Sequence, residues 1–264
     1  MVNRRRRNSV DPDTIIEPVL NIDETLMYTY RGDRFYQFGP GHLHGWVESS
    51  NIVIFFDNAM VVPFRSGKVW SIDGTFDVCP VGWAQMYTIS ILVDHHVLPI
   101  VYDLLPSKSG NCYLEFLSHL NRLIPGLDPD VVITDFEKAA INAFKTVYPS
   151  SRMSGCMFHL GQSIQRRLDS SGMSESYASD RVVRKFVQAL KCLAFVPAAQ
   201  VQQTFTWLRN HDDFPSCLAS TYAYFDKTYV SGANGNGPLY PLCLWNNREN
   251  VLADIPRTNN GIEG

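Results

Sequence analysis

The chain has 264 residues, of which 45% are hydrophobic and 12% aromatic, and its formal net charge is −3. Length and composition predict one large globular domain or two small ones with a substantial core. The slightly negative charge argues against a purely basic nucleic-acid-binding module. The longest apolar runs, such as Ile52–Phe56, are too short to span a bilayer, and the basic start of the chain lacks the apolar segment of a signal peptide.

The predicted elements begin after an N-terminal region, residues 1–50, that we expect to be partly disordered. Its arginine run, Arg4–Arg7, is typical of a nuclear import signal or a phosphate-binding arm, and equally of a solvated terminus. Residues 51–64 predict a strand and a short helix. Three more strands follow, joined by short connections that indicate an antiparallel meander: Val69–Phe76, Trp83–Val93 and Leu98–Leu105. Pro99 predicts that the third is an edge strand or begins there.

The next part of the chain alternates strands and helices. The predicted order is helix Tyr113–Leu123, strand Val131–Asp135, helix Glu137–Val147, strand Arg152–Cys156 and helix Phe158–Leu168. Three antiparallel strands followed by right-handed strand–helix units form a mixed sheet, and this is the element order of the ribonuclease H-like fold. We therefore expect an α/β core of this type over residues 51–169.

The pattern changes after Ser170, where strand alternation disappears. Val182, Phe186 and Leu190 recur at helical spacing, which predicts an all-helical insertion over residues 170–229. Residues 230–264 are then expected to return towards the sheet through a loop rich in glycine.

Two aspartates stand at comparable places in the predicted core. Asp73 lies on the strand in VWSIDGTFDVCP, and Asp135 ends the strand in VVITDFEKAA. The two strands are neighbours in this fold, so we expect the carboxylates to lie close enough to share a metal, which would relieve their repulsion. Mg²⁺ or Mn²⁺ held there would suit phosphoryl transfer. The alternative is that Asp135 caps the following helix.

A third acidic residue would complete such a site, and the sequence offers two candidates. Glu137 is close to Asp135, but at the start of a helix it also favours the helix dipole. Glu263, in PRTNNGIEG, would lie about one turn into a helix capped by Thr258 or Asn259.

Taken together, these motifs resemble the transposase domain of Mutator-like elements, the MULE domain. The resemblance spans most of the chain after residue 50 and is carried by WSIDGTFDVCP, LPIVYDLLPSKSGNCYLEFL, VVITDFEKAAINAFKTVYP, GCMFHLGQSIQRRL and PRTNNGIEG. It implies a DDE transposase that cuts transposon-end DNA and transfers strands with Mg²⁺ or Mn²⁺. Carried over from the family, the catalytic and metal-binding residues are Asp73, Asp135 and Glu263. The family also implies a multimer, and together with the arginine run a DNA partner favours a nuclear location.

The resemblance adds three accessory residues. The family's Cys-x-x-His element corresponds to Cys156 and His159, where the histidine would contact a DNA phosphate or position a carboxylate. The alternative is a buried cysteine beside a helix-capping histidine, and zinc is disfavoured because no second ligand pair has zinc-finger spacing. Trp245 matches a family tryptophan that would stack on an unpaired base, with core packing as the alternative.

The sequence also departs from the family pattern in two ways. Residues 1–50 contain no zinc finger, and Glu263 is followed by a single residue, which predicts a truncated copy with little or no activity. Two other functions stay open: a domesticated, non-catalytic DNA-binding transcription regulator, and a ribonuclease H-like nuclease. Retention of all three acidic residues favours the transposase lineage, while the helical insertion and the Thr-Asn-Asn signature disfavour the nuclease.

Overall fold

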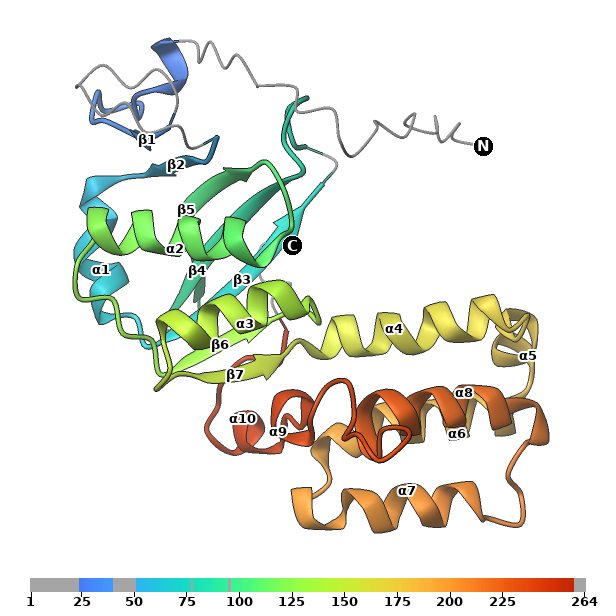
Figure 1. Cartoon of the computed structure of the whole chain (residues 1–264). Helices are drawn as coiled ribbons and strands as arrows, with labels where there is room; N and C mark the ends of the chain where they lie inside the picture. Colours follow the sequence, from blue (N-terminus) through green and yellow to red (C-terminus); the bar gives the residue numbers. More distant parts are fainter. Residues whose placement is uncertain (1–23, 40–50, 77, 95, 259–264) are drawn as a thin grey trace.

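The computed structural model describes residues 24–39, 51–76, 78–94 and 96–258. Its centre is a seven-stranded mixed sheet with the order β1-β2-β5-β4-β3-β6-β7 (Figure 1). The strands are β1 Tyr36–Phe38, β2 Val53–Phe56, β3 Val69–Thr75, β4 Gln85–Val93, β5 His96–Leu105, β6 Val131–Thr134 and β7 Arg152–Gly155. The first core strand, β3, lies between β4 and β6, which confirms the predicted ribonuclease H-like fold class.

Two strands extend this core at the side of β5. β2 pairs antiparallel with β5, and β1 pairs antiparallel with β2. The strand β2 was predicted. The strand β1 was not, because its three residues are too few to show an alternating pattern.

Pro99 lies in a central strand, so its prediction as a sign of an edge strand is wrong. β5 is flanked by β4 and β2, and Pro99 stands four residues into a strand that begins at His96. The β4–β5 pairing shifts register here, since Ile89 faces Val101 and the next residue, Ser90, faces Pro99. The irregularity accommodates a residue that has no N–H to donate to the ladder.

Two helices, α2 Gly110–Leu123 and α3 Lys138–Val147, pack against each other and against one face of the sheet (Figure 1). Their apolar stripes join β3 and β6 in the main core, which includes Trp70, Val132, Phe116 and Phe144. The start of α2 is fixed by Ser109, whose hydroxyl accepts the N–H of Cys112 at 3.2 Å. A shorter helix, α1 Val61–Ser66, contributes Phe64 to the same core.

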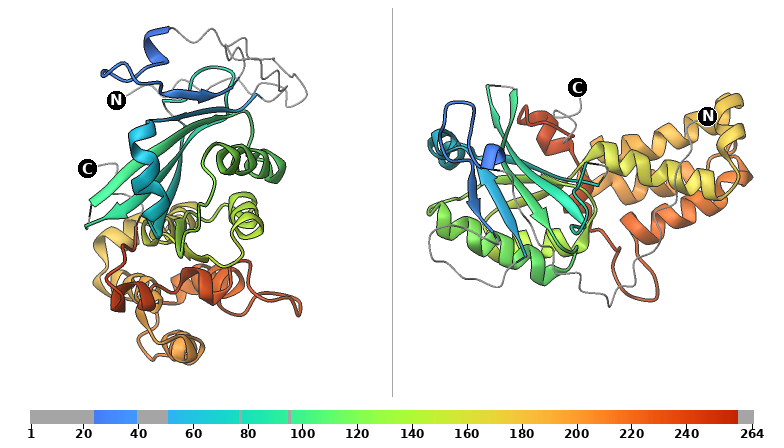
Figure 2. Two further views of the ribbon diagram at one scale, coloured as in Figure 1. Left: turned by 90° about the vertical axis from the view of Figure 1, so that its left-hand side faces the viewer. Right: turned by 90° about the horizontal axis from the view of Figure 1, so that it is seen from above.

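The remaining helices form a second unit beside β7. They are α4 Met157–Ser170, α5 Ser174–Ser179, α6 Arg181–Cys192, α7 Val201–Arg209, α8 Ala219–Phe225, the π-helical turn Asp226–Val230, α9 Leu242–Trp245 and α10 Arg248–Leu252. Figure 2 shows helices of this unit extending to one side of the sheet. Residues 170–229 contain no strand, consistent with the predicted helical insertion. The domain boundaries themselves stay predictions.

The helical unit has a hydrophobic core of its own, and α4 belongs to it. Leu160, Ile164 and Leu168 of α4 pack with residues of α6, α7 and α8. Asp180 starts α6, because its carboxylate accepts the N–H groups of Val182 and Val183. No helix in the described part of the chain is long and apolar enough to cross a membrane.

Candidate active site

The register of the β3–β6 pair determines how Asp73 and Asp135 lie relative to each other. The strands run parallel, and Val69 faces Val131, an offset of 62 residues (131 − 69). The same offset separates Asp73 from Asp135 (135 − 73). Continuing the register therefore brings the two aspartates to the same level, at the carboxyl ends of neighbouring strands.

Both aspartates are expected on the sheet face opposite α2 and α3. Val69, Val131 and Ile133 line that face, where they pack with Cys156. Successive strand residues alternate between faces, so Asp73 falls on this face as well. Its direct partner in β4 is Thr88, which is buried.

Electrostatics provide an independent sign that acidic groups gather at this end of the sheet. The pKa of Tyr87 is raised well above its usual value, first by complete burial and then by Tyr113, Asp135, Glu137 and Asp73. All three carboxylates thus lie close enough to disfavour a phenolate at one buried position. Negative charge is concentrated where a cation would be needed.

Glu137 is directed towards its own partners beside the pair of aspartates. Its Oε1 accepts the hydroxyl of Tyr113 at 2.6 Å, and its Oε2 lies 3.6 Å from Nζ of Lys108. Burial, followed by the bond to Glu137, raises the pKa of Tyr113, so its hydroxyl keeps the proton that it donates. The Tyr113 oxygen in turn accepts Nε2 of Gln85 at 2.6 Å.

Asp135 makes a local hydrogen bond of the kind that the capping alternative anticipates. One oxygen of its carboxylate, Oδ1, accepts the main-chain N–H of Glu137 at 3.0 Å. Glu137 occupies the N-cap position of α3, so this bond orders the approach to the helix. The bond fixes the carboxylate while using one face of one oxygen, so it does not prevent metal binding.

A divalent cation fits the donor chemistry of the aspartate pair. Mg²⁺ is typically held by one or two carboxylates, with water and substrate phosphates completing its shell. In the ranges that the structure describes, no group of three His, Cys, Asp or Glu side chains could hold a metal. Glu263 lies outside these ranges, and Glu137 faces Tyr113 and Lys108. The identity of a third ligand therefore stays a prediction.

A cleft of about 410 Å³ opens beside Asp135, between the sheet and the helical unit. Its walls include Asp135 and Glu137 from the sheet side, and His159, Gln162, Arg166, Tyr224, Tyr229 and Tyr240 from the helical unit and the return segment. The cleft thus combines carboxylates, cationic or polar side chains on one face of α4, and aromatic rings. Arg166 is exposed there, and its Nη2 donates to Oε1 of Gln162 at 2.6 Å.

The Cys-x-x-His pair separates into a packing residue and a cleft residue. Cys156 is completely buried against Val131 and Ile133, as the packing alternative states. His159 makes no capping bond at the start of α4 but lines the cleft with Asp135. Its Nδ1 is buried without a hydrogen-bond partner among the described residues. The sequence spacing pointed to this residue, although not to its neighbours in the cleft.

Trp245 is a core residue of the helical unit in this structure. It is fully buried, its indole N–H donates to the main-chain oxygen of Tyr229 at 2.8 Å, and its ring makes an edge contact with Phe225. Stacking on a base would require the cluster to open. Its placement agrees with the packing alternative.

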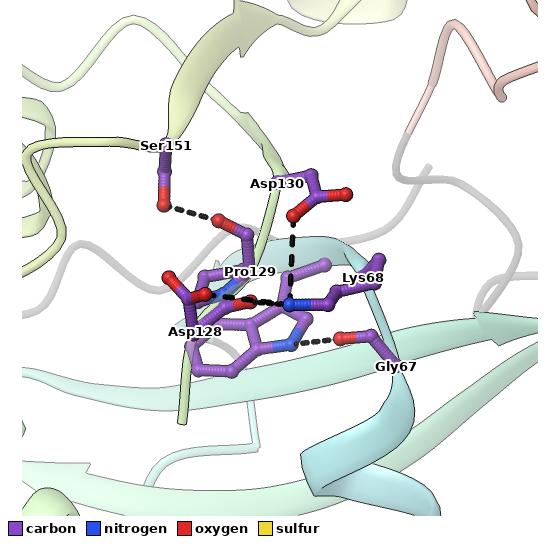
Figure 3. A network of polar contacts seen from close by, with 7 residues as sticks. Gly67, Lys68, Asp128, Pro129, Asp130 and Ser151 are labelled. Atoms are coloured by element: carbon purple, nitrogen blue, oxygen red, sulfur yellow. Dashed lines mark hydrogen bonds and ion pairs between the residues drawn. The ribbon is translucent and has the colours of Figure 1, made fainter. Parts of the chain in front are cut away.

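The opposite end of the β3–β6 pair is closed by a different polar network (Figure 3). Nζ of Lys68 lies 2.7 Å from the main-chain oxygen of Asp128, 3.4 Å from its carboxylate and 3.6 Å from the carboxylate of Asp130. The main-chain oxygen of Lys68 accepts the N–H groups of Asp130 and Val131 at 2.8 and 3.0 Å. Main-chain and side-chain contacts together join the strands where they begin.

Comparison with known proteins adds one family. A search of curated proteins finds no match. The family model of the MULE transposase domain matches residues 69–163. This segment contains Asp73, Asp135, Cys156 and His159, which lie on β3, β6 and the start of α4. The family that the sequence motifs predicted is thus confirmed for residues 69–163, which match the MULE transposase domain.

Proposed function

We propose that the chain performs the DDE reaction of MULE transposases, which is metal-dependent cleavage and strand transfer of DNA by in-line phosphoryl transfer. The observation that carries the proposal is the shared offset of 62 residues. It relates the β3–β6 ladder and the pair Asp73 and Asp135, both inside the matched segment. A helix cap alone would not require a second carboxylate at the same level of the neighbouring strand.

In this proposal the chain's own residues bind and orient, and the metal supplies the Lewis acid. Mg²⁺ or Mn²⁺, when bound, would stabilise charge on the attacking and leaving oxygens. Asp73 and Asp135 would hold the metal, and the N–H of Glu137 keeps Asp135 in place. His159 and Arg166 line the cleft beside Asp135 and would orient the phosphate backbone of the DNA.

The path of the last described residues supports Glu263 as the third acidic residue. The main-chain oxygen of Arg257 accepts the N–H of Met157 at 2.8 Å, at the start of α4. Ile255 packs against the cluster that contains Val131 and Ile133, on the face expected for Asp73. Residues 254–258 also line a hollow of about 530 Å³ with Leu92 of β4. The segment leading to Glu263 therefore starts beside the proposed site.

Metal binding and DNA cleavage test the proposal together. The whole chain is titrated with Mn²⁺ by calorimetry, and nicking of a supercoiled plasmid is followed with and without Mn²⁺. Asp73→Asn is expected to weaken Mn²⁺ binding and reduce nicking by more than 100-fold, beyond the roughly 10–100-fold typical of residues outside the ligand shell. Equal Mn²⁺ affinity in Asp73→Asn and the unchanged chain would overturn the site. Plasmid binding without Mn²⁺-dependent nicking would favour the domesticated regulator.

A nuclear location and a multimeric form remain parts of the proposal. The matched domain implies DNA as the partner. The run Arg4–Arg7, outside the described residues, would supply the import signal. Imaging of a fluorescent fusion, with and without alanines at these four positions, tests the first point. Light scattering of the purified chain tests the second.

A further inference from the structure

The backbone ladder between β3 and β6 stops before it reaches the aspartates. The last paired residues are Ser71 and Ile133, two positions ahead of Asp73 and Asp135. β3 continues beside β4 as far as Thr75, but β6 ends at Thr134. The spacing of the two carboxylates is therefore not set by hydrogen bonds between their own strands.

Side chains around Glu137 make the connection that the ladder lacks. On one side the N–H of Glu137 holds Oδ1 of Asp135. On the other side its carboxylate pairs with Nζ of Lys108, which in turn lies 3.7 Å from the centre of the Phe76 ring. Phe76 directly follows β3. A chain of three contacts thus runs from the end of β3 to Asp135.

The Tyr113 hydroxyl anchors this chain to the interior. Tyr113 and Gln85 are completely buried, and their hydrogen bond of 2.6 Å ties α2 to β4. Tyr113 then donates to Glu137 at 2.6 Å, a short bond to a carboxylate and so stronger than a bond between neutral groups. The Glu137 side chain has two fixed partners, so its main-chain N–H is held in one orientation towards Asp135.

We propose that Glu137 is a positioning residue for the Asp73 and Asp135 pair, acting through Tyr113 and Lys108 rather than by ligating the metal. The inference rests on the proposed function, because it assigns Glu137 a role towards the cation of that site. Metal ligands must be held within about 0.5 Å of their productive positions, and partners outside the ligand shell supply that order. Glu137 does so at the point where the parallel ladder has ended.

Three variants of the whole chain test this role: Tyr113→Phe, Glu137→Gln and Lys108→Met. Each removes one contact of the chain and keeps nearly the same side-chain volume. Mn²⁺ affinity by calorimetry and the spectrum of bound Mn²⁺ by electron paramagnetic resonance are the readouts. Tyr113→Phe and Glu137→Gln are expected to weaken Mn²⁺ binding by roughly 10–100-fold, the usual effect of losing such a partner. Lys108→Met is expected to have a smaller effect in the same direction, restored by Lys108→Arg.

The matched control is Lys68→Met, at the other end of the same two strands. Lys68 is about as exposed as Lys108 and also pairs with acidic side chains, so it reports the general cost of losing such an ion pair. It is expected to leave Mn²⁺ affinity within twofold of the unchanged chain. Thermal unfolding of every variant shows whether the fold is intact. Glu137→Gln carries the test if Tyr113→Phe, which changes a buried group, does not fold.

The outcomes separate this inference from the function on which it rests. Loss of Mn²⁺ binding in Asp73→Asn, with Tyr113→Phe and Glu137→Gln within twofold of the unchanged chain, overturns the positioning role alone. A loss in Glu137→Gln as complete as that in Asp73→Asn, with Tyr113→Phe unaffected, makes Glu137 a ligand and also overturns it. No effect of Asp73→Asn overturns both.

Discussion

The two ends of the β3–β6 pair are built in different ways from similar residues. Where the strands begin, main-chain bonds to Lys68 join them, and one lysine meets the carboxylates of Asp128 and Asp130. Where they end, the ladder stops early and Asp73 and Asp135 come to one level beyond it. The comparison teaches that charge alone does not mark a site. At the first end acidic groups have a lysine between them, and at the second the register brings two together.

The largest effect is expected from Trp70, the main packing residue at the beginning of β3. It is fully buried, its indole donates to the main-chain oxygen of Gly67 at 3.0 Å, and it stacks on Phe64. Trp70→Ala should lower the free energy of unfolding by about 3–5 kcal/mol, the usual cost of such a cavity. Urea denaturation measures this loss.

The comparison predicts that this loss is confined to stability. In the cold, where the variant is still folded, Mn²⁺ affinity of Trp70→Ala should stay within twofold of the unchanged chain. A large loss of Mn²⁺ affinity with little loss of stability would mean that the two ends are not independent.

A second prediction uses a carboxylate that belongs to neither end. Asp103 of β5 pairs with Tyr87 and Ile54 in the sheet, is fully buried, and has no hydrogen-bond partner for either oxygen among the described residues. Burial raises its pKa well above the usual value. Its contribution to stability is thus complete below the unfolded-state pKa, near 4, and is lost as the pH rises towards the folded-state pKa.

Asp103→Leu should remove this loss and raise the free energy of unfolding at pH 7 by about 1–3 kcal/mol. Urea denaturation of both proteins between pH 4.5 and pH 8 measures the difference, which should grow with pH. A difference that stays constant across this range would show that Asp103 does not titrate differently in the folded chain.

The smallest effect on stability is expected at Gly74, beside Asp73. A Cβ at this position would lie 2.6 Å from Oε1 of Gln85, whose amide is bonded to Tyr113. Gly74→Ala should cost about 1–2 kcal/mol, at the low end for overpacking, because the end of the Gln85 side chain can rotate away. Since that rotation breaks the bond to Tyr113, Mn²⁺ affinity should fall more than stability does.

The double variant Gly74→Ala with Gln85→Ala separates the clash from the lost hydrogen bond. It should recover the stability but not the Mn²⁺ affinity. Recovery of both would show that the bond from Gln85 to Tyr113 has no part in ordering the carboxylates.

The sequence predicted the fold where the pattern of the chain is local and strong. Alternation in β3 to β5, the apolar run of β6 and the helical stripe at Val182, Phe186 and Leu190 each depend on neighbouring residues. The pairing of Asp73 with Asp135 was also predictable, because the fold class places their strands side by side. The agreement of the 62-residue offset then followed from aligned strand beginnings.

The polar connections around the site could not be predicted in the same way. Lys108, Tyr113 and Glu137 come from a loop, a helix and a helix start, and their contacts depend on how α2 and α3 pack. No sequence spacing indicates that distance. The burial of Trp245 likewise depends on α8 and the π-helical turn that follows it.

Helix α4 has a mechanical consequence for the whole molecule. It starts at the end of β7, with its first N–H bound to Arg257, and its apolar side is embedded in the helical unit. Its 14 residues make a rod about 21 Å long. A tilt of about 5° at the sheet would move its far end by about 2 Å. Conversely, force applied to the helical unit is delivered by this lever to the strand next to β6, where Asp135 begins the turn into α3.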